Sequence, residues 1–416
     1  MSSIQNHCFM SIIRNRKILN DPVYGFINIP DGLLYEIIHH PYFQRLRRIR
    51  QLGMSYLVYP GATHTRFLHT LGSFHLTNTA LSILKEKGVS VSDQESEAVL
   101  AAILLHDIGH GPFSHALEDL IVPNIRHEEL SLAYMQFFNR KYNGALDKAI
   151  DIFSGGYKHK FLHALVSSQL DADRLDYLKR DSFFTGVSEG VISTDRIIKM
   201  LNVVDDELVV DIKGIYSVEK FLIARRLMYW QVYLHKTVVS SEMLLRNIII
   251  RARELTMKGK KLWGPPALIF FLSNTQFILD DKMLEHFAML DDDDMTASLK
   301  IWQYDEDPVL SRLCAMYIQR NLFKIRLQSE PFTTEEIARL KQRVSETFNL
   351  APEEAAYFVV SDMLTNNAYK PDSGIIKVLN KDGSTSDLAD VSDMFDHEIL
   401  SQTVKKYFLC FPRELA

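Results

Sequence analysis

An uninterrupted apolar run, AVLAAILL at residues 98–105, ends directly in His106 and Asp107. A helix built from this run is apolar on every side, so it belongs in the centre of a folded domain. Polar side chains at the end of such a helix are costly to bury unless they find partners there. The run therefore predicts a helical domain whose core carries an imidazole and a carboxylate at one spot.

The residues that follow the run extend this polar spot. The segment LLHDIGHGPFSH, residues 104–115, adds His110 and His115 around a break made of glycine and proline. Neutral imidazole and carboxylate groups are standard ligands of divalent metals. The alternative is a core His–Asp pair that is satisfied by hydrogen bonds and followed by a glycine turn.

A second polar segment is HTRFLHTLGSFH, residues 64–75, in which Arg66 and His69 are three residues apart. On a helix this spacing places both side chains on one face. Taken alone, an Arg–His pair of this kind is typical of a solvated helix surface. Its meaning therefore depends on what the rest of the chain brings beside it.

The third segment is LDADRLDYLKRDS, residues 170–182, where Asp173, Tyr177 and Asp181 recur every four residues. This spacing lines them up along one helical face. A salt-bridged surface is the alternative interpretation. Together, the three segments supply imidazoles, carboxylates and a cation, which are the groups that a metal-assisted attack on phosphate requires.

The remaining pattern predicts a mainly α-helical chain with few strands. Ser92 or Asp93 is expected to cap the apolar helix, because both side chains accept hydrogen bonds from a helix start. We expect β-hairpins at 17–29 and 201–212, helices at 31–39, 41–49, 64–87, 128–142, 161–184 and 217–257, a further helix from about 113, mostly helices after 266, and strands within 355–363 and 373–384. The expected division is a catalytic segment, 1–260, with a core of about 64–190 and a substrate helix of about 217–257, followed by an accessory segment, 261–416.

Composition excludes several classes of protein. The 416 residues carry a formal charge of only −5, so nothing global favours a nucleic-acid or membrane partner, and a substrate with several phosphates would need locally placed cations. The three cysteines do not form a disulfide framework and fit a reducing cytoplasm. The N-terminus lacks the apolar stretch of a signal peptide, and the apolar run at 98–105 is too short to span a bilayer. We therefore expect a cytoplasmic protein.

The motifs also carry a family resemblance. A lone histidine, an adjacent His–Asp pair and a distant aspartate resemble the HD-domain phosphohydrolases. The segments DPVYGFINI, PYFQRLRRIRQLG, YPGATHTRFLHTLG, HDIGHGPFSH, RHE and DADRLDYLKRD are similar to the deoxynucleoside triphosphate (dNTP) triphosphohydrolase branch. The resemblance covers about residues 17–240. It implies an HD-domain helical fold with short β-hairpins, a small mixed α/β C-terminal region, and hydrolysis of dNTPs to deoxynucleoside and inorganic triphosphate.

The resemblance also implies residue roles. The metal ligands would be His69, His106, Asp107 and Asp173. The reacting centre would hold Arg66 near the α-phosphate, together with His110, His127 and His115, the last oriented by Glu118 as general acid for the departing 5′-oxygen. Arg174 and Arg225 would hold phosphates, Gln51 and Asp181 would read the sugar 3′-hydroxyl, Tyr177 would exclude a 2′-hydroxyl, and Tyr233 would border the same pocket.

Several alternatives stay open at this level. Another HD phosphohydrolase would act on nucleoside monophosphates, cyclic nucleotides or guanosine polyphosphate alarmones. A protein of another class would sense nucleotides or bind nucleic acid through a vestigial site. With two nitrogen and two oxygen ligands, the single divalent metal can be Mn, Fe, Co, Ni, Zn or Mg, and additional Mg can accompany the substrate phosphates.

An arginine cluster adjoins Gln51. Arg45, Arg47, Arg48 and Arg50 lie close together in the sequence, and like charges repel unless carboxylates or phosphates neutralise them. The resemblance implies a homo-oligomer, so we expect part of this cluster to face a neighbouring subunit or a bound nucleotide. A solvated basic helix is the alternative.

Overall fold

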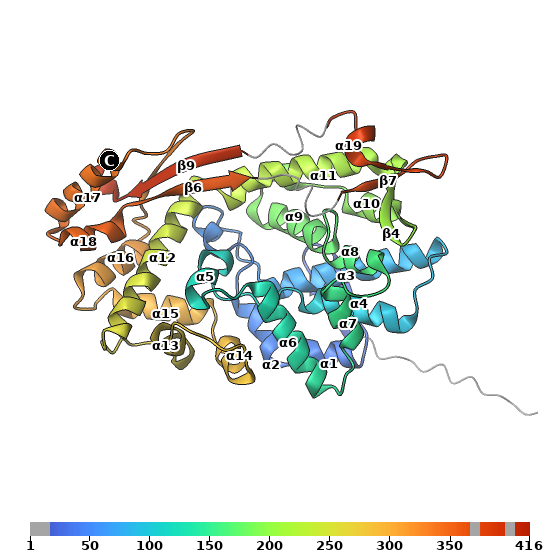
Figure 1. Cartoon of the computed structure of the whole chain (residues 1–416), viewed down its shortest axis with the longest axis horizontal. Coiled ribbons are helices and arrows are strands. Elements are labelled where there is room, and N and C mark those ends of the chain that lie inside the picture. Colours follow the sequence, from blue (N-terminus) through green and yellow to red (C-terminus); the bar gives the residue numbers. More distant parts are fainter. Residues whose placement is uncertain (1–16, 367–374, 396–403) are drawn as a thin grey trace, which may run out of the picture.

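The computed structural model describes residues 17–366, 375–395 and 404–416. It is mainly α-helical, with three small sheets at its periphery (Figure 1). The fold class predicted from the sequence is confirmed. Among the described residues, none of the helices combines the length and the hydropathy that a membrane crossing requires.

The first part of the chain carries most of the helices that surround the polar spot. The hairpin strands are β1 (Lys17–Asp21) and β2 (Gly25–Ile29). The helices are α1 (Leu33–His39), α2 (Pro41–Gln44), α3 (Arg66–Glu86), α4 (Asp93–Leu105), α5 (Glu118–Ile121), α6 (His127–Lys141), α7 (Asp147–Phe153), α8 (Lys160–Val166), α9 (Ala172–Thr185) and α10 (Thr194–Met200). Short 3-10 helices are η1 (Arg45–Arg48), η2 (Gly53–Leu57), η3 (Ser114–Ala116) and η4 (Ser188–Gly190).

The second part extends the helical body and adds two sheets. Its helices are α11 (Ile215–Met228), α12 (Lys236–Met257), α13 (Pro266–Ser273), α14 (Asp281–Ala288), α15 (Asp292–Trp302), α16 (Pro308–Ile318), α17 (Thr334–Phe348), α18 (Pro352–Ala355) and α19 (Leu388–Val391). Its strands are β3 (Leu201–Val204), β4 (Glu207–Asp211), β5 (Lys324–Gln328), β6 (Val360–Asn366), β7 (Lys377–Leu379), β8 (Thr385–Asp387) and β9 (Val404–Phe411). Shorter elements are η5 (Ile212–Gly214), the π-helix η6 (Tyr229–Tyr233), η7 (Ala356–Phe358) and η9 (Arg413–Leu415).

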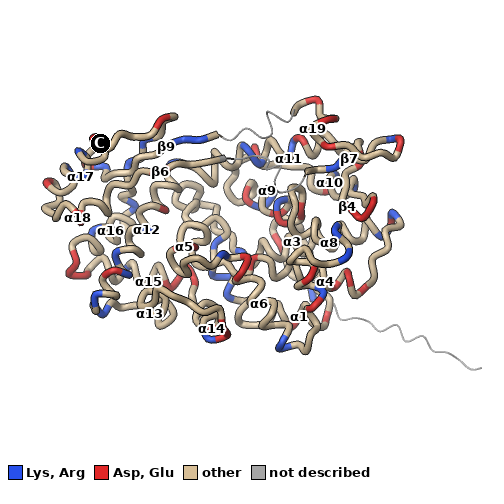
Figure 2. Tube along the Cα trace, viewed as in Figure 1, with Lys and Arg blue, Asp and Glu red and all other residues tan. Residues whose placement is uncertain are grey.

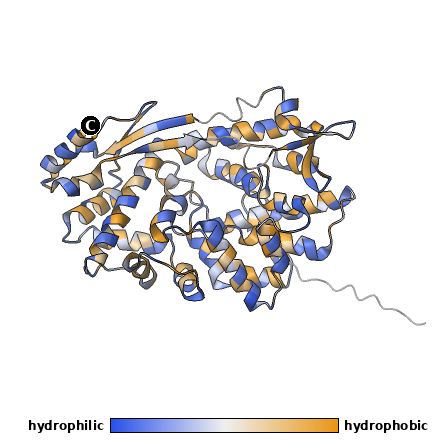
Figure 3. Cartoon of the chain, viewed as in Figure 1, coloured by the Kyte–Doolittle hydropathy of each residue, from blue (hydrophilic) through white to orange (hydrophobic). Residues whose placement is uncertain are grey.

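The apolar run forms the predicted central helix, α4. Its residues from Ala98 to Leu105 are all buried, and it packs against α3, α7 and α8. Ser92 caps the helix in a capping box with Glu95, as the sequence led us to expect. Most other helices carry both hydrophobic and hydrophilic residues, as Figure 3 shows, which suits elements with one face in the core and one in solvent.

Two helices expected as single elements are each divided in two. The helix expected at 161–184 breaks into α8 and α9, because the Asp171 side chain accepts hydrogen bonds from the backbone N–H groups of Ser168 and Arg174, each at 2.8 Å or less, and starts a new helix. The helix expected at 217–257 breaks at the π-helix η6, after which the His235 side chain caps α12. The helices expected at 41–49 and from 113 are also shorter than predicted, since 3-10 turns replace their ends or starts.

The last strands join the two proposed segments of the chain. β7 pairs in parallel with β4, so the sheet β3-β4-β7-β8 contains residues from both 1–260 and 261–416. A second sheet, β5-β9-β6, includes β5, which the sequence analysis did not predict. One hydrophobic core runs from Ile27 to Leu415. The proposed division therefore separates two stretches of sequence that share a core.

The arginine cluster is paired within the chain. Arg45 is fully buried and donates to the backbone carbonyls of Leu290, Ile108 and His110. Arg48 pairs with Asp291, Arg50 pairs with Asp292, and Arg47 lies over the Phe67 ring. Carbonyls and carboxylates of the same chain therefore neutralise much of the charge of this cluster. Arg47 and Arg48 stay exposed, so the expectation that part of the cluster faces a neighbouring subunit or a bound nucleotide stays a prediction. Elsewhere, acidic and basic residues are interspersed along the described chain (Figure 2).

Candidate functional site

Three helices bring the predicted metal ligands together. α3 packs against both α4 and α9, which places His69 beside the end of α4 and the start of α9. His106 and Asp107 follow directly after α4, and Asp173 lies in the first turn of α9. Gly72 allows the close approach of α3 and α9, because a Cβ on it would come within 1.9 Å of Asp176 Oδ1. The three sequence segments therefore meet at one place.

The candidate ligand atoms converge at distances that suit one cation. The Nε2 atom of His69 lies 3.0 Å from Asp173 Oδ1 and 3.6 Å from Asp107 Oδ2. The Nε2 atom of His106 lies 3.6 Å from Asp173 Oδ1 and 3.4 Å from Asp107 Oδ1. Ligand atoms about 2 Å from a shared metal are separated by about 3 Å, which is close to these values.

The hydrogen bonds of both imidazoles leave the converging nitrogens open. His69 Nδ1 bonds to Asp176 at 2.8 Å, and His106 Nδ1 bonds to the Ile103 carbonyl at 2.6 Å. The Nε2 atoms of both rings are buried and lack a hydrogen-bond partner within the described chain. Metal-ligating histidines characteristically fix one nitrogen in this way and present the other to the ion. The residues therefore fit a divalent cation.

The site attracts positive charge. Although burial disfavours a charged imidazole, the neighbouring carboxylates of Asp173, Asp176 and Asp107 raise the pKa of His69 to about 10. Carboxylates packed this closely need a cation to balance them. A divalent ion held between the two Nε2 atoms would supply that charge.

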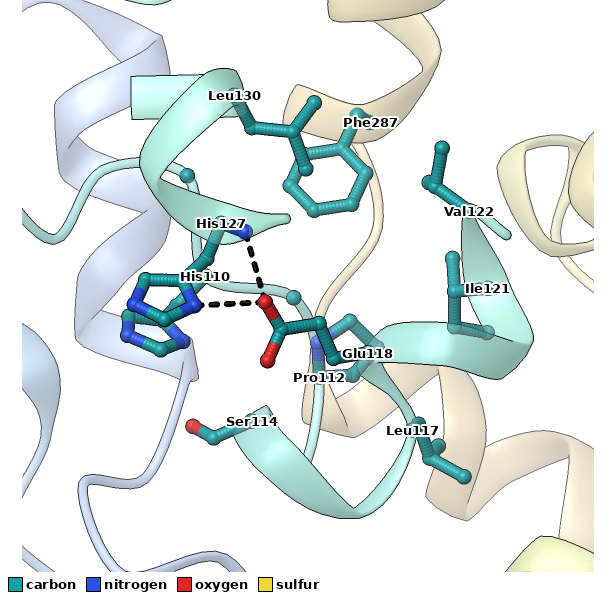
Figure 4. Close-up of a pocket in the computed structure, with 12 residues that line it drawn as sticks. His110, Pro112, Ser114, Leu117, Glu118, Ile121, Val122, His127, Leu130 and Phe287 are labelled. Atoms are coloured by element: carbon teal, nitrogen blue, oxygen red, sulfur yellow. Dashed lines mark hydrogen bonds and ion pairs between the residues drawn. The ribbon is translucent and has the colours of Figure 1, made fainter. Parts of the chain in front are cut away.

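A second group of imidazoles lies next to the first. His110 and His127 stack with ring centroids 3.9 Å apart, and His115 meets both rings edge-on. Figure 4 shows how Glu118 accepts hydrogen bonds from the backbone N–H and the ring of His127, at 2.7 and 2.6 Å. Ring nitrogens of all three residues lie within 4.8 Å of one another, so this cluster could also hold a cation. Its contacts with Glu118 suit it to proton transfer and substrate contact.

Glu118 fixes the imidazoles that it touches. Its other oxygen lies 3.2 Å from His115 Nδ1. Burial opposes its ionisation, but the hydrogen bonds from His115 and His127 hold the pKa of Glu118 far below its ordinary value. The carboxylate therefore stays charged and orients both rings. Burial, together with the charge of Arg66, lowers the pKa of His110, which leaves this ring neutral.

Arg66 joins the two groups. It is buried, pairs with Asp107, and donates from Nε to the Ser114 hydroxyl at 2.9 Å. The positive φ values of Phe113 and Ser114, 52° and 45°, turn the chain after Gly111 so that Ser114 reaches the arginine. This cation lies beside the candidate metal ligands, where an anionic oxygen of a substrate would be held.

An open cavity of about 400 Å³ connects these groups to solvent. Its size falls within the range of small-molecule sites in proteins. The residues predicted from the sequence that line it are Gln51, Arg66, Asp107, His110, His115, His127, Asp173, Tyr177, Asp181 and Tyr233. Most of the expected site residues therefore share a single cavity.

One end of the cavity carries the residues expected to bind the sugar. Asp181 is buried and accepts hydrogen bonds from His64 at 2.8 Å and from the Tyr233 hydroxyl at 2.9 Å. The Oε1 atom of Gln51 is buried without a hydrogen-bond partner within the described chain. Tyr177 meets Tyr233 edge-on, with ring centroids 6.1 Å apart. An unsatisfied amide oxygen of this kind is costly unless a ligand reaches it.

Two predicted phosphate-binding residues lie outside the cavity lining. Arg174 pairs with Asp171, and the buried Arg225 donates to Gln169 at 3.2 Å. Neither residue lines the cavity. Both are close enough to Tyr177 for their charges to lower its pKa, although burial raises that pKa more strongly. The Nε atoms of both arginines lack a partner within the described chain. Their expected role remains a proposal.

Sequence reasoning missed several partners of the site residues. Asp176 orients His69 and is itself held by Arg180, while His64 orients Asp181. Asp176 and Arg180 belong to the same charged segment as Asp173, so their spacing of four was a usable signal. No sequence signal pointed to His64, because its partner, Asp181, is 117 residues away. Glu242 and Tyr229 also line the cavity and were not predicted.

Comparisons with known proteins agree with this geometry. Residues 66–178 match the HD domain, and residues 192–262 match the HD associated region. An uncharacterized protein of Bacillus subtilis is 32% identical over 364 residues, which cover 86% of this chain and 82% of that protein. The deoxynucleoside triphosphate triphosphohydrolase SAMHD1 of Homo sapiens is 28% identical over 416 residues, which cover 88% of this chain and 62% of that protein.

Solved structures give the same result. The crystal structure of a phosphohydrolase from Bacteroides thetaiotaomicron is 52% identical, covers 96% of this chain and 100% of its own, and superposes with a TM-score of 0.93. A hypothetical protein from Aquifex aeolicus is 28% identical, covers 96% of this chain and 98% of its own, and has a TM-score of 0.72. With its helical fold, its matched HD domain and these relatives, the chain belongs to the HD-domain phosphohydrolase superfamily, alongside the dNTP triphosphohydrolases.

Proposed function

We propose that this protein hydrolyses dNTPs to deoxynucleoside and inorganic triphosphate. The observation that carries the proposal is the continuity of one cavity from the metal ligands and the imidazole cluster to a buried pair, Asp181 and Gln51, suited to a sugar hydroxyl. Similarity to proteins named deoxynucleoside triphosphate triphosphohydrolases supports the same substrate class.

The metal site would be formed by His69, His106, Asp107 and Asp173. A divalent ion there, one of Mn, Fe, Co, Ni, Zn or Mg, supplies Lewis-acid polarisation of a phosphoryl oxygen and of a water molecule. Two nitrogen and two oxygen donors do not select among these metals.

The chain's own residues would position and protonate the substrate. Arg66 holds an oxygen of the α-phosphate, so that water attacks phosphorus and the bond from phosphorus to the 5′-oxygen breaks. His115, oriented by the ionised Glu118, gives its proton to the departing 5′-oxygen. His110 and His127 exclude bulk water beside it. Arg174 and Arg225 take the outer phosphates once the substrate is seated.

The same cavity would read the sugar. Gln51 and Asp181 bind the 3′-hydroxyl, and Tyr177 occupies the space in which a ribonucleotide would carry its 2′-hydroxyl. Tyr233, fixed by its hydrogen bond to Asp181, closes the pocket beside them.

A product screen tests the proposal. The purified protein is incubated with each dNTP and NTP in the presence of each candidate metal, and the phosphate products are separated. The proposal requires intact tripolyphosphate from dNTPs and its absence with a His106→Ala variant. Release of pyrophosphate or orthophosphate as the primary product, or cleavage of monophosphates, cyclic nucleotides or alarmones in its place, would contradict it.

A further inference from the structure

One end of the cavity lies along a face of α12. Val238 and Glu242 are four residues apart on this helix, and both line the cavity. Leu52 and Gly53 line it from the neighbourhood of η2, and Ala116 lines it from η3. α12 packs against both η2 and η3, and it lies beside α5 (Figure 1). This end is a mostly apolar slot with one carboxylate in its wall.

Among the described residues, that carboxylate has no hydrogen-bonding partner. Glu242 makes no hydrogen bond and no ion pair with the rest of the described chain. Arg246, one turn further along α12, donates to both oxygens of Asp119, at 2.7 and 2.9 Å, and to the Ala116 carbonyl at 2.8 Å. Its donors are therefore directed away from Glu242.

Burial makes this arrangement costly for the free protein. Removal from water raises the pKa of Glu242 to about 7, against the opposing effect of the Arg246 charge. A partly buried carboxylate that faces a ligand cavity without a partner is satisfied when a bound molecule donates hydrogen bonds to it. The apolar walls formed by Leu52 and Val238 suit the flat faces of an aromatic ring.

We propose that Glu242 reads the nucleobase of the bound nucleotide and selects guanine. This inference rests on the proposed function, because a nucleotide whose sugar lies between Gln51 and Tyr233 directs its base along this slot. An ionised carboxylate accepts two parallel hydrogen bonds, and the guanine edge offers two adjacent donors, N1–H and the 2-amino group.

The other bases fit the carboxylate less well. Adenine and cytosine each place one amino donor beside an unprotonated ring nitrogen, which repels the second carboxylate oxygen. Thymine offers a single N–H flanked by two carbonyl oxygens. The expected order of affinity is therefore dGTP first, dATP and dCTP next, and dTTP last.

Binding measurements test this order directly. The full-length, metal-loaded protein is titrated at pH 8 with dNTP analogues in which a methylene group replaces the 5′-oxygen, so that the scissile bond cannot break. For the wild type, the dGTP analogue should bind about 5- to 100-fold more tightly than the dTTP analogue, the discrimination of one bidentate contact to a base edge.

Two substitutions make the test specific. Glu242→Gln presents one acceptor and one donor, a pattern that an edge of each of the four bases can match, so the preference for the dGTP analogue should be lost. Glu242→Leu should bind the four analogues with similar affinity. As a control, Glu254→Gln removes the same charge from a half-exposed position about three turns further along α12 and should leave the wild-type order unchanged.

The outcomes are separable from those of the activity assay. Equal wild-type affinities, or a Glu242→Gln protein that keeps its preference for dGTP, would overturn the role of Glu242 even if tripolyphosphate is released. A preference for the dGTP analogue that both Glu242→Gln and Glu242→Leu remove would support the role even if no dNTP is cleaved. Failure of every analogue to bind the wild type would overturn both proposals.

Discussion

At the scale of single residues, the polar spot at the end of α4 is the part of the site that the sequence analysis predicted most fully. His106 and Asp107 stand out because they end a wholly apolar helix, and burial there leaves few explanations other than a bound partner. His69 and Asp173 needed the family resemblance, because each alone matches a surface helix. Their partners, such as His64, belong to contacts that only the folded chain creates.

The ligand assignment leads to a direct expectation for His106→Ala and Asp107→Ala. Each variant should lose the bound metal and more than about a thousandfold of its activity, because Lewis-acid stabilisation contributes several kcal/mol to such reactions. The helical circular dichroism should be unchanged, with the exposed His39→Ala as control. Metal analysis of the purified proteins decides it: undiminished stoichiometry in either site variant would show that the assignment is wrong.

Tyr177 allows a test of sugar selection. If its ring excludes a 2′-hydroxyl by its volume, Tyr177→Ala should raise the ratio of kcat/KM for NTPs over dNTPs by about tenfold or more. Tyr177→Phe keeps the ring and loses only the hydroxyl, so it should retain the wild-type ratio. An unchanged ratio in the Ala variant, or an equal rise in the Phe variant, would remove steric exclusion as the cause.

At the scale of secondary-structure elements, capping residues decide where helices begin, and two of these signals were missed. Asp171 and His235 both accept hydrogen bonds from the backbone that follows them, and each starts a helix within a stretch whose apolar pattern runs on without a break. The π-helix before His235 has the Leu234 N–H bonded to the Tyr229 carbonyl, five residues back. Tyr229 and Tyr233 line the cavity from this irregular turn.

Asp292, in the first turn of α15, also connects two distant segments of the site. The acidic run at 291–294 begins α15, yet Asp292 is buried and accepts from the backbone N–H groups of Phe113 and Arg50, at 2.9 and 3.0 Å. It thereby joins the turn that precedes His115 to the segment that carries Gln51. From the sequence alone, a run of four aspartates is expected to be solvated. The burial of Asp292 could not be predicted, because its hydrogen-bond partners lie about 180 and 240 residues away.

The capping box of α4 gives a stability expectation. Ser92→Ala should lower the free energy of unfolding by about 1 kcal/mol, and the mid-helix Ser82→Ala should change it little. Although burial opposes it, hydrogen bonds from Ser92 and Tyr157 lower the pKa of Glu95 to about 2.

The pH dependence follows from that pKa. Because the folded pKa of Glu95 lies below the unfolded value of about 4.3, its ionised form stabilises the fold above pH 4.3, and this contribution is lost as the pH falls towards 2. Denaturant titrations at pH 7 and pH 3 measure both effects. If Ser92→Ala lowers the free energy of unfolding by as much at pH 3 as at pH 7, the hydrogen bonds to the ionised Glu95 are not the origin of the loss.

At the scale of the whole molecule, the helical fold class was predictable because apolar periodicity repeats over many turns. The long-range sheet contacts were not, since β7 joins β4 across more than 160 residues, and the alternating pattern of β5 covers only the five residues KIRLQ. The arginine cluster shows the same limit: four like charges suggest an external partner until the fold supplies Asp291, Asp292 and three carbonyls.

Assembly remains a proposal at this scale. We expect a homo-oligomer, as the family resemblance implies, and the exposed Arg47 and Arg48 stay candidates for contact with a neighbouring subunit or a nucleotide. Light scattering over a range of protein concentrations, with and without dNTP, measures the mass. A monomer under every condition would contradict the proposal. Association that requires nucleotide would support a phosphate that bridges neighbouring subunits.

The most direct test of the whole account follows the oxygen of the attacking water. A dNTP is hydrolysed in water enriched in oxygen-18, and the products are analysed by phosphorus NMR and mass spectrometry. Attack at the α-phosphorus beside His115 and Arg66 should yield intact triphosphate carrying one labelled oxygen and an unlabelled deoxynucleoside. Label in the deoxynucleoside, or label in pyrophosphate or orthophosphate released first, would contradict it.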